Sequence, residues 1–472
     1  MQNQAIDLPP LTASVKSEIN VSNEPIITDD SISKVFWRYA IPSIAAMVVN
    51  GLYQVIDGIF VGHYVGFEGL AGINMTMPII GVIIGLGLMV GMGGGSLMSI
   101  YRGQEKAHKS YKVLVNSLWL IIILAALSTY LISTLSDPLL NLQGAIGNTL
   151  SYSRDYLSVF VWGAGFAIAA AVIPMLIRND NSPNFATGLM IFGALVNIAL
   201  DYILIGIHSM GLQGAAIATI ASQSLVFCIG IAYFFSAKAQ TKLTLAGLSL
   251  KLDVAIKIIT LGASSLFMFM YFSLVIALHN KLLMAYGSSV SVGAFAIIGY
   301  IATLYYVTAE GIANGMQPPV SFYFGAKQTE KIKATVILAL KVVLYLGIGI
   351  VLILNIFPDL FIHLFSSADA ELAAETQTGL RLHLFALYLD GFLFIATVYF
   401  MSVNQGAKAL SISIGNIAVQ LPFLYFLPQW LGIDGVWLSL PISNVLLTII
   451  VVPMLWRDMQ KMCKPKTCKS IV

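Results

Sequence analysis

Residues 118–132 read LWLIIILAALSTYLI, and long apolar runs of this kind decide the fold of the chain. A helix needs roughly 20 such residues to cross about 30 Å of hydrocarbon. The chain has 472 residues, of which 58% are apolar and 10% charged, and its mean hydropathy is +0.86. Soluble domains carry about 25% charged residues. The composition therefore predicts an integral membrane protein and excludes an ordinary soluble enzyme.

The apolar runs are continuous, whereas the strands of a transmembrane barrel show short alternating segments. We therefore predict an all-α membrane protein with twelve transmembrane helices. The expected spans, with approximate boundaries, are 35–62, 69–100, 113–135, 151–178, 184–206, 212–236, 255–285, 290–322, 332–356, 378–402, 407–428 and 433–456.

Lysine and arginine are distributed unevenly between the loops. Alternate loops and both ends of the chain hold nearly all of them, and the other loops hold only Arg154, Lys281 and Arg381. Short cytoplasmic loops collect basic residues, so both termini are expected in the cytoplasm of a multi-pass protein of the inner (plasma) membrane. The first 33 residues are polar and show no signal-peptide pattern.

Two motifs recur at nearly the same offset, which indicates an internal repeat. GLQG at 211–214 matches GIDG at 432–435 at an offset of 221, and Tyr101-Arg-Gly103 matches Tyr323-Phe-Gly325 at an offset of 222. Six spans per repeat predict two six-helix lobes related by a pseudo-two-fold axis along the membrane normal. The expected division is a polar N-terminal tail at 1–33, an N-lobe at 34–238, a cytoplasmic inter-lobe loop at 239–254, a C-lobe at 255–456 and a basic C-terminal tail at 457–472.

Four carboxylates fall inside the expected spans: Asp57, Asp201, Glu310 and Asp390. Ionisable groups are costly in hydrocarbon and usually mark a functional site. No lysine or arginine is expected at mid-span to neutralise them. Desolvation favours the neutral form of such groups, so we expect them to exchange protons.

In the first half, the pairs Tyr53 and Asp57, and Asn197 and Asp201, are each four residues apart and share a helix face. Thr219 lies on the next span. Phenol, amide, carboxylate and hydroxyl oxygens in one dry pocket would hold either a proton or a hard cation such as Na⁺. The alternative is that these groups are hydrogen-bonding contacts between helices.

In the second half, Glu310, Asn314 and Gln317 form a polar stripe at helical spacing. Pro318-Pro319 is expected to break the helix just beyond the stripe, as happens where a membrane helix lines a cavity. The alternative for Glu310 and Asp390 is a polar contact near a helix end. GLGLMVGMGGGS at 85–96 contains GxG fragments, but it lies inside a span, which favours close helix packing over phosphate binding.

These residues resemble the multidrug and toxic compound extrusion (MATE) transporters, in particular the bacterial branch around DinF and MepA. The resemblance runs from about 34 to 456. It rests on IPSIAAMVVNGLYQVIDGIFVGHYVG at 41–66, on NIALDYILIG at 197–206 followed by GLQGAAIAT, and on EGIANGMQPPVSFYFGA at 310–326.

The resemblance implies a proton- or sodium-driven exporter with two six-helix lobes around a cleft. It assigns helix bending to Pro42, and the glutamate that sodium-coupled relatives carry in the seventh span has no counterpart here. Asp390 keeps the position of the tenth-span aspartate. The residues matching the cation or proton site of relatives are Asp57, Asn197, Asp201, Tyr53 and Thr219.

The sequence thus predicts a secondary-active antiporter that expels cationic drugs and dyes in exchange for H⁺ or Na⁺. We expect a monomer in membrane lipid, with no cofactor, no nucleic-acid partner and no metal site other than a Na⁺ site at Tyr53, Asn197, Asp201 and Thr219. One alternative is a flippase for lipid-linked saccharides, in which several Arg or Lys residues would line the cleft. An intramembrane enzyme is disfavoured because the spans hold no HExxH or GxSxG motif.

Overall fold

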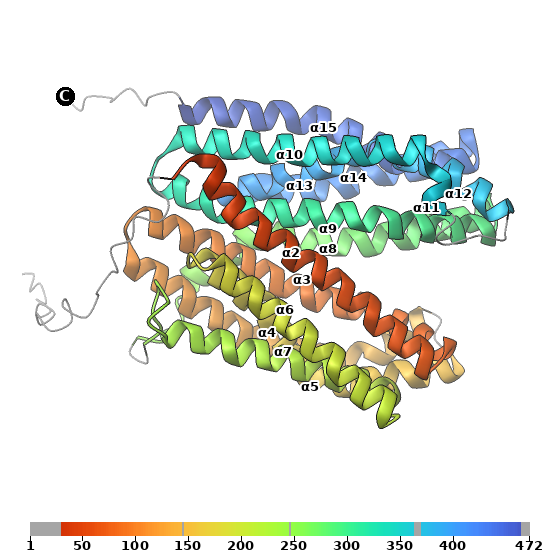
Figure 1. Cartoon of the computed structure of the whole chain (residues 1–472), viewed down its shortest axis with the longest axis horizontal. Helices are drawn as coiled ribbons and strands as arrows, with labels where there is room; N and C mark the ends of the chain where they lie inside the picture. Colours follow the sequence, from red (N-terminus) through yellow and green to blue (C-terminus); the bar gives the residue numbers. More distant parts are fainter. Residues whose placement is uncertain (1–29, 144–145, 245–246, 363–369, 464–472) are drawn as a thin grey trace, which may run out of the picture.

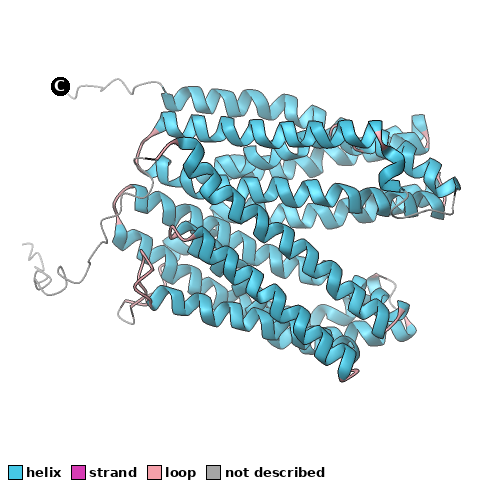
Figure 2. Cartoon of the chain, viewed as in Figure 1, coloured by secondary structure: helices cyan, strands magenta, loops and turns pink. Residues whose placement is uncertain are grey.

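The computed structural model describes residues 30–143, 146–244, 247–362 and 370–463, and these form helices and loops (Figure 2). The expected tails at 1–33 and 457–472 lie largely outside the described residues. The N-lobe consists of α2 (Ile32–Tyr64), α3 (Phe67–Gly103), α4 (Ala107–Leu142), α5 (Gly147–Asn179), α6 (Pro183–Asp201), the π-helix η1 (Tyr202–Ile207) and α7 (Gly211–Phe235). The C-lobe consists of α8 (Leu252–Tyr286), α9 (Ser289–Gly325), α10 (Thr329–Ile356), α11 (Pro358–Ile362), α12 (Ala370–His383), α13 (Leu387–Ser402), α14 (Gly406–Leu431) and α15 (Ile433–Cys463).

Within the described residues, eleven helices are long and apolar enough to cross a membrane, and α12 with α13 forms a twelfth span bent by 45°. The all-helical, multi-pass prediction is confirmed. The tenth span begins at Ala370, earlier than the expected start at 378, because the polar helix α12 precedes the apolar helix α13 across the bend. The last helix, α15, continues to Cys463, beyond its expected end at 456.

Each lobe encloses its own apolar core, but one helix from each lobe crosses into the other. Phe36 and Tyr39, near the start of α2, belong to the C-lobe core. Ile258 and Leu261, near the start of α8, belong to the N-lobe core. Figure 1 shows α2 running diagonally from the C-lobe to the N-lobe. The two crossing helices tie the lobes together at the end of the bundle where both helices begin.

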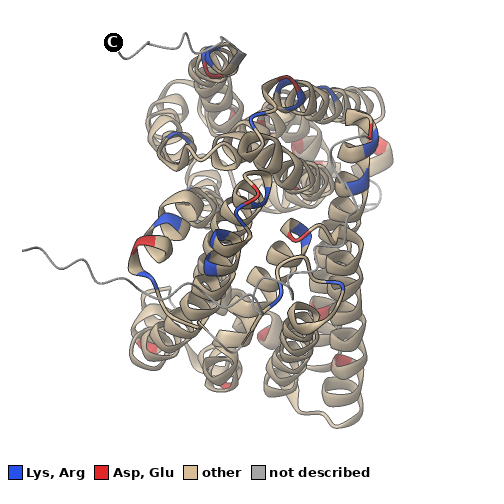
Figure 3. Ribbon diagram, turned by 90° about the vertical axis from the view of Figure 1, so that its left-hand side faces the viewer, with Lys and Arg blue, Asp and Glu red and all other residues tan. Residues whose placement is uncertain are grey.

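We call that end the basic end, because the loops there carry the lysine-rich set predicted from the sequence. It includes the connections at 104–106, 236–251 and 326–328, and Figure 3 looks onto it. The lobes lie together at the basic end and diverge toward the opposite end, which we call the open end (Figure 1).

Two glycine pairs allow the lobes to meet at the basic end. A Cβ on Gly93 of α3 would collide with the carbonyl oxygen of Ile258 on α8, and a Cβ on Gly262 of α8 would collide with that of Met89 on α3. A second pair, Gly103 of α3 and Gly325 of α9, meets in the same way. The glycine-rich segment at 85–96 is therefore a helix-packing surface, as predicted.

The helix α9 runs without interruption through Pro318 and Pro319 to Gly325, so the expected break at these prolines is wrong. Each proline removes one backbone N–H. Membrane helices tolerate this loss where neighbouring helices and local adjustments compensate for the freed carbonyls. Gly315 and Gly311, one and two turns earlier on the same helix, pack directly against the backbone of α2, which supports α9 along this stretch.

The loop that follows α5 is anchored to the loop that follows α7. The Asp180 carboxylate accepts hydrogen bonds from the Tyr233 hydroxyl (3.0 Å) and from the backbone N–H groups of Gln240 (2.7 Å) and Thr241 (2.9 Å). Burial raises the pKa of the Asp180 carboxyl, and the nearby positive charge of Arg102 opposes that shift. These contacts hold the N-lobe loops together at the basic end.

Candidate functional site

The predicted N-lobe residues come together between α2 and α6. Asp201 is fully buried and Asn197 nearly so. One carboxylate oxygen of Asp57, both carboxylate oxygens of Asp201 and both amide atoms of Asn197 are buried without a hydrogen-bond partner among the described residues. The carboxyl groups of Asp57 and Asp201 are close enough to interact electrostatically. The site therefore concentrates negative charge and unused hydrogen-bonding capacity.

A change in helix type places Asp201 in this cluster. The α-helix α6 ends at Asp201, and the π-helix η1 continues the span from Tyr202 to Ile207. The wider turn continues to the N–H of His208, which donates to the carbonyl of Ile203 five residues earlier at 3.0 Å. Such π-helical turns are rare and are frequent at functional sites. The sequence analysis expected an ordinary helix here and gave no indication of this turn.

Two tyrosines lie around the carboxylates. The phenol groups of Tyr53 on α2 and Tyr156 on α5 each interact electrostatically with both Asp57 and Asp201. The Tyr156 hydroxyl also lies close to the side chain of Thr219 on α7, so the predicted Thr219 adjoins the cluster through a tyrosine. The sequence analysis missed Tyr156 because Arg154 and Asp155 precede it and resemble an interfacial segment.

The carboxylate of Asp390, in the C-lobe, has a different environment. Asp390 lies in the first turn of α13, just after the bend that follows α12. Its Oδ1 accepts a hydrogen bond from the Asn444 side-chain amide at 2.6 Å, and its Oδ2 accepts one from the Tyr306 hydroxyl at 3.2 Å. Both carboxylate oxygens are therefore satisfied by the C-lobe itself.

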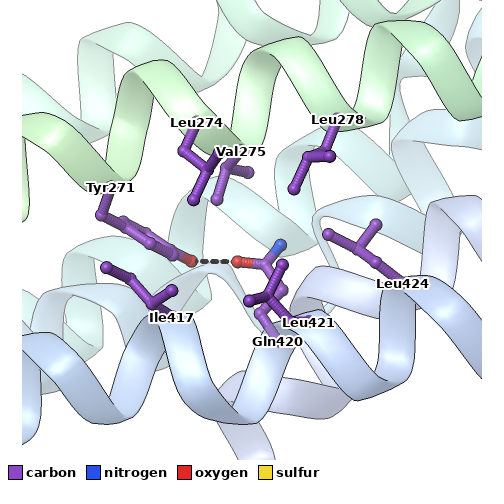
Figure 4. Close-up of a pocket in the computed structure, with 8 residues that line it drawn as sticks. All are labelled: Tyr271, Leu274, Val275, Leu278, Ile417, Gln420, Leu421 and Leu424. Atoms are coloured by element: carbon purple, nitrogen blue, oxygen red, sulfur yellow. Dashed lines mark hydrogen bonds between the residues drawn. The ribbon is translucent and has the colours of Figure 1, made fainter.

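A shallow, mostly apolar depression lies nearby between α8 and α14 (Figure 4). The hydroxyl of Tyr271 donates to the amide oxygen of Gln420 at 2.5 Å across it. The remaining lining side chains are aliphatic: Leu274, Val275, Leu278, Ile417, Leu421 and Leu424. This polar pair fills the depression rather than opening it to a ligand.

The predicted stripe on α9 divides into two parts. Gln317 is buried and belongs to the contact between the lobes, where its amide group exchanges hydrogen bonds with Asn179 at 2.9 and 3.0 Å and donates to Ser96 at 3.0 Å. Glu310 and Asn314 lie one to two turns away toward the open end, and their side chains are close enough to interact. The stripe is therefore not a single binding site.

One basic residue at the end of a span is buried. Arg178 is the last residue of the expected span 151–178, and it lies in the last turn of α5 with 1% of its surface exposed. It is close enough to Glu310 on α9 to interact electrostatically with it. The long side chain extends from the end of the helix into the contact between the lobes. The sequence indicates where the backbone of Arg178 lies, but not the direction of its side chain.

Pro42 lies inside α2, which remains one continuous helix from Ile32 to Tyr64. The carbonyl of Pro42 accepts a hydrogen bond from the Thr187 hydroxyl on α6 at 2.7 Å. The proline segment of α2 is thus attached to the same helix that carries Asn197 and Asp201. The expected bend at this proline stays a prediction.

The fold and the site define a membrane transporter of two lobes, with buried carboxylates and a contact between the lobes at one end. The MatE family model matches residues 42–203 and 260–426, so the chain belongs to the MatE family. Members of this family are transporters and not enzymes.

Among similar proteins, the "Multidrug export protein MepA" of Staphylococcus saprophyticus is 24% identical over 91% of this chain and 95% of its own length. The protein of the same name from Staphylococcus haemolyticus is 24% identical over 88% of this chain and 91% of its own length. A solved structure described as an "Outward-facing conformation of a multidrug resistance MATE family transporter of the MOP superfamily" is 25% identical, with a TM-score of 0.86 over 92% of this chain and 97% of that chain.

Proposed function

We propose that this protein is a secondary-active antiporter that exports lipophilic organic cations in exchange for inward H⁺, with Na⁺ as the second candidate ion. The observation that carries the proposal is the N-lobe cluster of Asp57, Asn197 and Asp201, whose buried oxygens have no hydrogen-bond partner in the part of the chain that the structure describes. Buried polar atoms without partners are costly, so a bound proton or cation would stabilise them.

The coupling ion is proposed from the residues of the cluster and from the acidic residues of α8. Two neighbouring carboxyl groups in a dry environment cannot both be charged without a large cost, which favours a shared proton. The seventh span, α8, has an acid only at its first turn, Asp253, and none in its membrane-crossing part. The oxygens of Tyr53, Asn197, Asp201 and Thr219 also suit a hard cation, which keeps Na⁺ as the alternative.

The cargo class follows from charge. Asp57, Asp201, Glu310 and Asp390 give the transmembrane part of the protein four acidic groups, and opposite charge concentrates cations in a low-dielectric site. The names of the Staphylococcus relatives describe multidrug export, which supports a broad range of cargo. A flippase for lipid-linked saccharides would need several basic groups in the cleft, and Arg178 is a single one.

The membrane orientation follows from the basic end. Positive residues favour the cytoplasmic side, so we place the basic end and both termini in the cytoplasm and the protein, as a monomer, in the plasma membrane. The lobes meet at the basic end, which corresponds to an outward-facing state. Transport then requires the lobes to separate at the basic end and close at the open end.

In this mechanism Asp57 acts as a switch on α2. A ligand can shift a conformational equilibrium only through different binding energies in the two states. Charged Asp57 needs polar neighbours or water, whereas protonated Asp57 can donate a hydrogen bond to Asp201 or Asn197 and pack more closely. Because α2 also crosses into the C-lobe core, a change around Asp57 can reach the contact between the lobes.

The function is tested with right-side-out membrane vesicles that contain the protein and are loaded with a fluorescent cationic dye, under an imposed proton gradient or an imposed sodium gradient. We expect dye movement that follows the proton gradient. Movement that follows only the sodium gradient would reassign the ion. No movement under either gradient, with the protein confirmed in the membrane, would refute the transport proposal.

A further inference from the structure

Arg178 is the most unusual charged residue among those that the structure describes, because it is buried without an ion pair. Its Nε and Nη2 atoms have no hydrogen-bond partner, and its Nη1 makes only a long contact of 3.7 Å with the sulfur of Met175. Arginine keeps its charge in proteins. A buried charge without a partner is strongly destabilising, so the protein must compensate it in another state or with a ligand.

The unused atoms have a specific geometry. Nε and Nη2 lie on the same edge of the guanidinium plane, and this pair of donors matches the two oxygens of a carboxylate or a phosphate. The remaining nitrogen, Nη1, is the one turned toward Met175. The side chain therefore presents a complete anion-recognition edge that none of the described residues occupies.

Arg178 lies where the lobes must separate during transport. The next residue, Asn179, forms the hydrogen bonds to Gln317 that join α5 to α9 at the basic end. Separation of the lobes there breaks these bonds and leaves Arg178 on the N-lobe wall. Glu310 of the C-lobe, with which Arg178 interacts electrostatically, is then on the facing wall.

We infer that Arg178 and Glu310 form a subsite for zwitterionic organic compounds, in which Nε and Nη2 of Arg178 bind the carboxylate and Glu310 faces the cationic group. This inference rests on the proposed transport function and names a substrate class for it. The negative charge of Glu310 disfavours a phosphate dianion at this place. A zwitterion leaves the pair of side chains and the cargo with no net charge.

The test compares two dyes that differ in one group. Rhodamine B carries a cation and a free carboxylate, whereas its ethyl ester carries only the cation. Fluorescence polarisation measures binding of each dye to the purified full-length protein, and vesicle efflux of the ester tests the underlying transport function separately. Arg178→Met removes the charge at similar side-chain length, and Arg178→Lys keeps the charge without the paired donors.

We expect Arg178→Met to weaken binding of rhodamine B by about tenfold or more and binding of the ester by less than about twofold. Arg178→Lys should fall between wild type and Arg178→Met for rhodamine B, because a lysine offers a point charge only. Glu310→Gln should weaken both dyes, since both carry the cation. The matched control is Arg154→Met on the same helix, where Arg154 is exposed and paired with Asp137 at 2.8 Å, and it should change neither dye.

Equal weakening of both dyes by Arg178→Met would overturn the inference, because it would indicate a purely structural contact between the lobes. Unchanged binding of rhodamine B in Arg178→Met, or unchanged binding of both dyes in Glu310→Gln, would also overturn it. If Arg178→Met does not fold, Arg178→Lys gives the same comparison. Absence of ester efflux by the wild-type protein would refute the proposed function instead.

Discussion

Both lobes carry carboxylates inside membrane-crossing helices, but the surroundings of these carboxylates differ. In the N-lobe, Asp201 and Asn197 are buried and none of their side-chain N or O atoms has a partner among the described residues. In the C-lobe, both oxygens of Asp390 accept hydrogen bonds, from Asn444 and Tyr306. The acidic sites of the two lobes therefore differ in chemistry.

The difference indicates which lobe responds to an ion. An unsatisfied buried polar group costs about 1–3 kcal/mol, so the N-lobe cluster gains more from a bound proton or cation than a site that is already satisfied. A change in the surroundings of Asp390 would break its existing hydrogen bonds, and this cost favours an unchanged arrangement around Asp390 during transport. We therefore expect coupling in the N-lobe and a positioning role for Asp390.

The largest effect is expected from Asp57→Asn, which mimics the neutral carboxyl group. It should abolish coupled efflux while leaving folding and dye binding intact, because the switch can no longer lose its proton. The measurement is gradient-driven dye efflux from right-side-out vesicles, with dye binding to the purified variant as the control for folding. Efflux at the wild-type rate would remove Asp57 from the mechanism and make Asp201 the leading candidate.

Gly262→Val should have the next largest effect. Its side chain would meet the carbonyl oxygen of Met89 on α3, so the lobes could not close at the basic end. Efflux should fall strongly, whereas the N-lobe cluster remains intact and proton binding should persist. Gly188→Val is the matched control, since no atom lies within 4 Å of an added Cβ there. Equal efflux in both variants would contradict the packing role of Gly262.

Asp390→Ala should affect stability more than coupling. The substitution leaves the Tyr306 hydroxyl and the Asn444 amide without their partner, and we expect a loss of about 1–3 kcal/mol in unfolding free energy. Denaturant unfolding of the purified protein measures the stability, and the ratio of protons to dye transported measures the coupling. A changed ratio with unchanged stability would reverse the roles that we assign to the two lobes.

The membrane fold could be predicted from the sequence because the apolar runs, the basic loops and the repeat all depend on local composition. Tyr53, Asp57, Asn197 and Asp201 could also be found, since mid-span polar groups at helical spacing share a face. Other features depend on tertiary contacts that spacing does not encode. They include the entry of Tyr156 into the cluster, the π-helical turn after Asp201, the continuity of α9 through its prolines and the burial of Arg178.

The smallest effect is expected from Pro42→Ala. The proline removes one backbone hydrogen bond within α2, and Thr187 attaches this segment to α6 at 2.7 Å. Restoring the backbone N–H should stiffen α2 and slow turnover, with coupling and ion preference unchanged. Initial efflux rates at saturating dye measure the change. A faster rate, or a loss as complete as that of Asp57→Asn, would contradict the view of Pro42 as a flexible point.

The central claim is that the N-lobe carboxylates exchange the coupling proton. It is tested most directly by measuring proton release when a cationic dye is added to purified protein in weakly buffered solution. Our account predicts release from the wild-type protein and from Asp390→Asn, and none from Asp57→Asn. Release from Asp57→Asn equal to that of wild type, together with its loss in Asp390→Asn, would contradict the account.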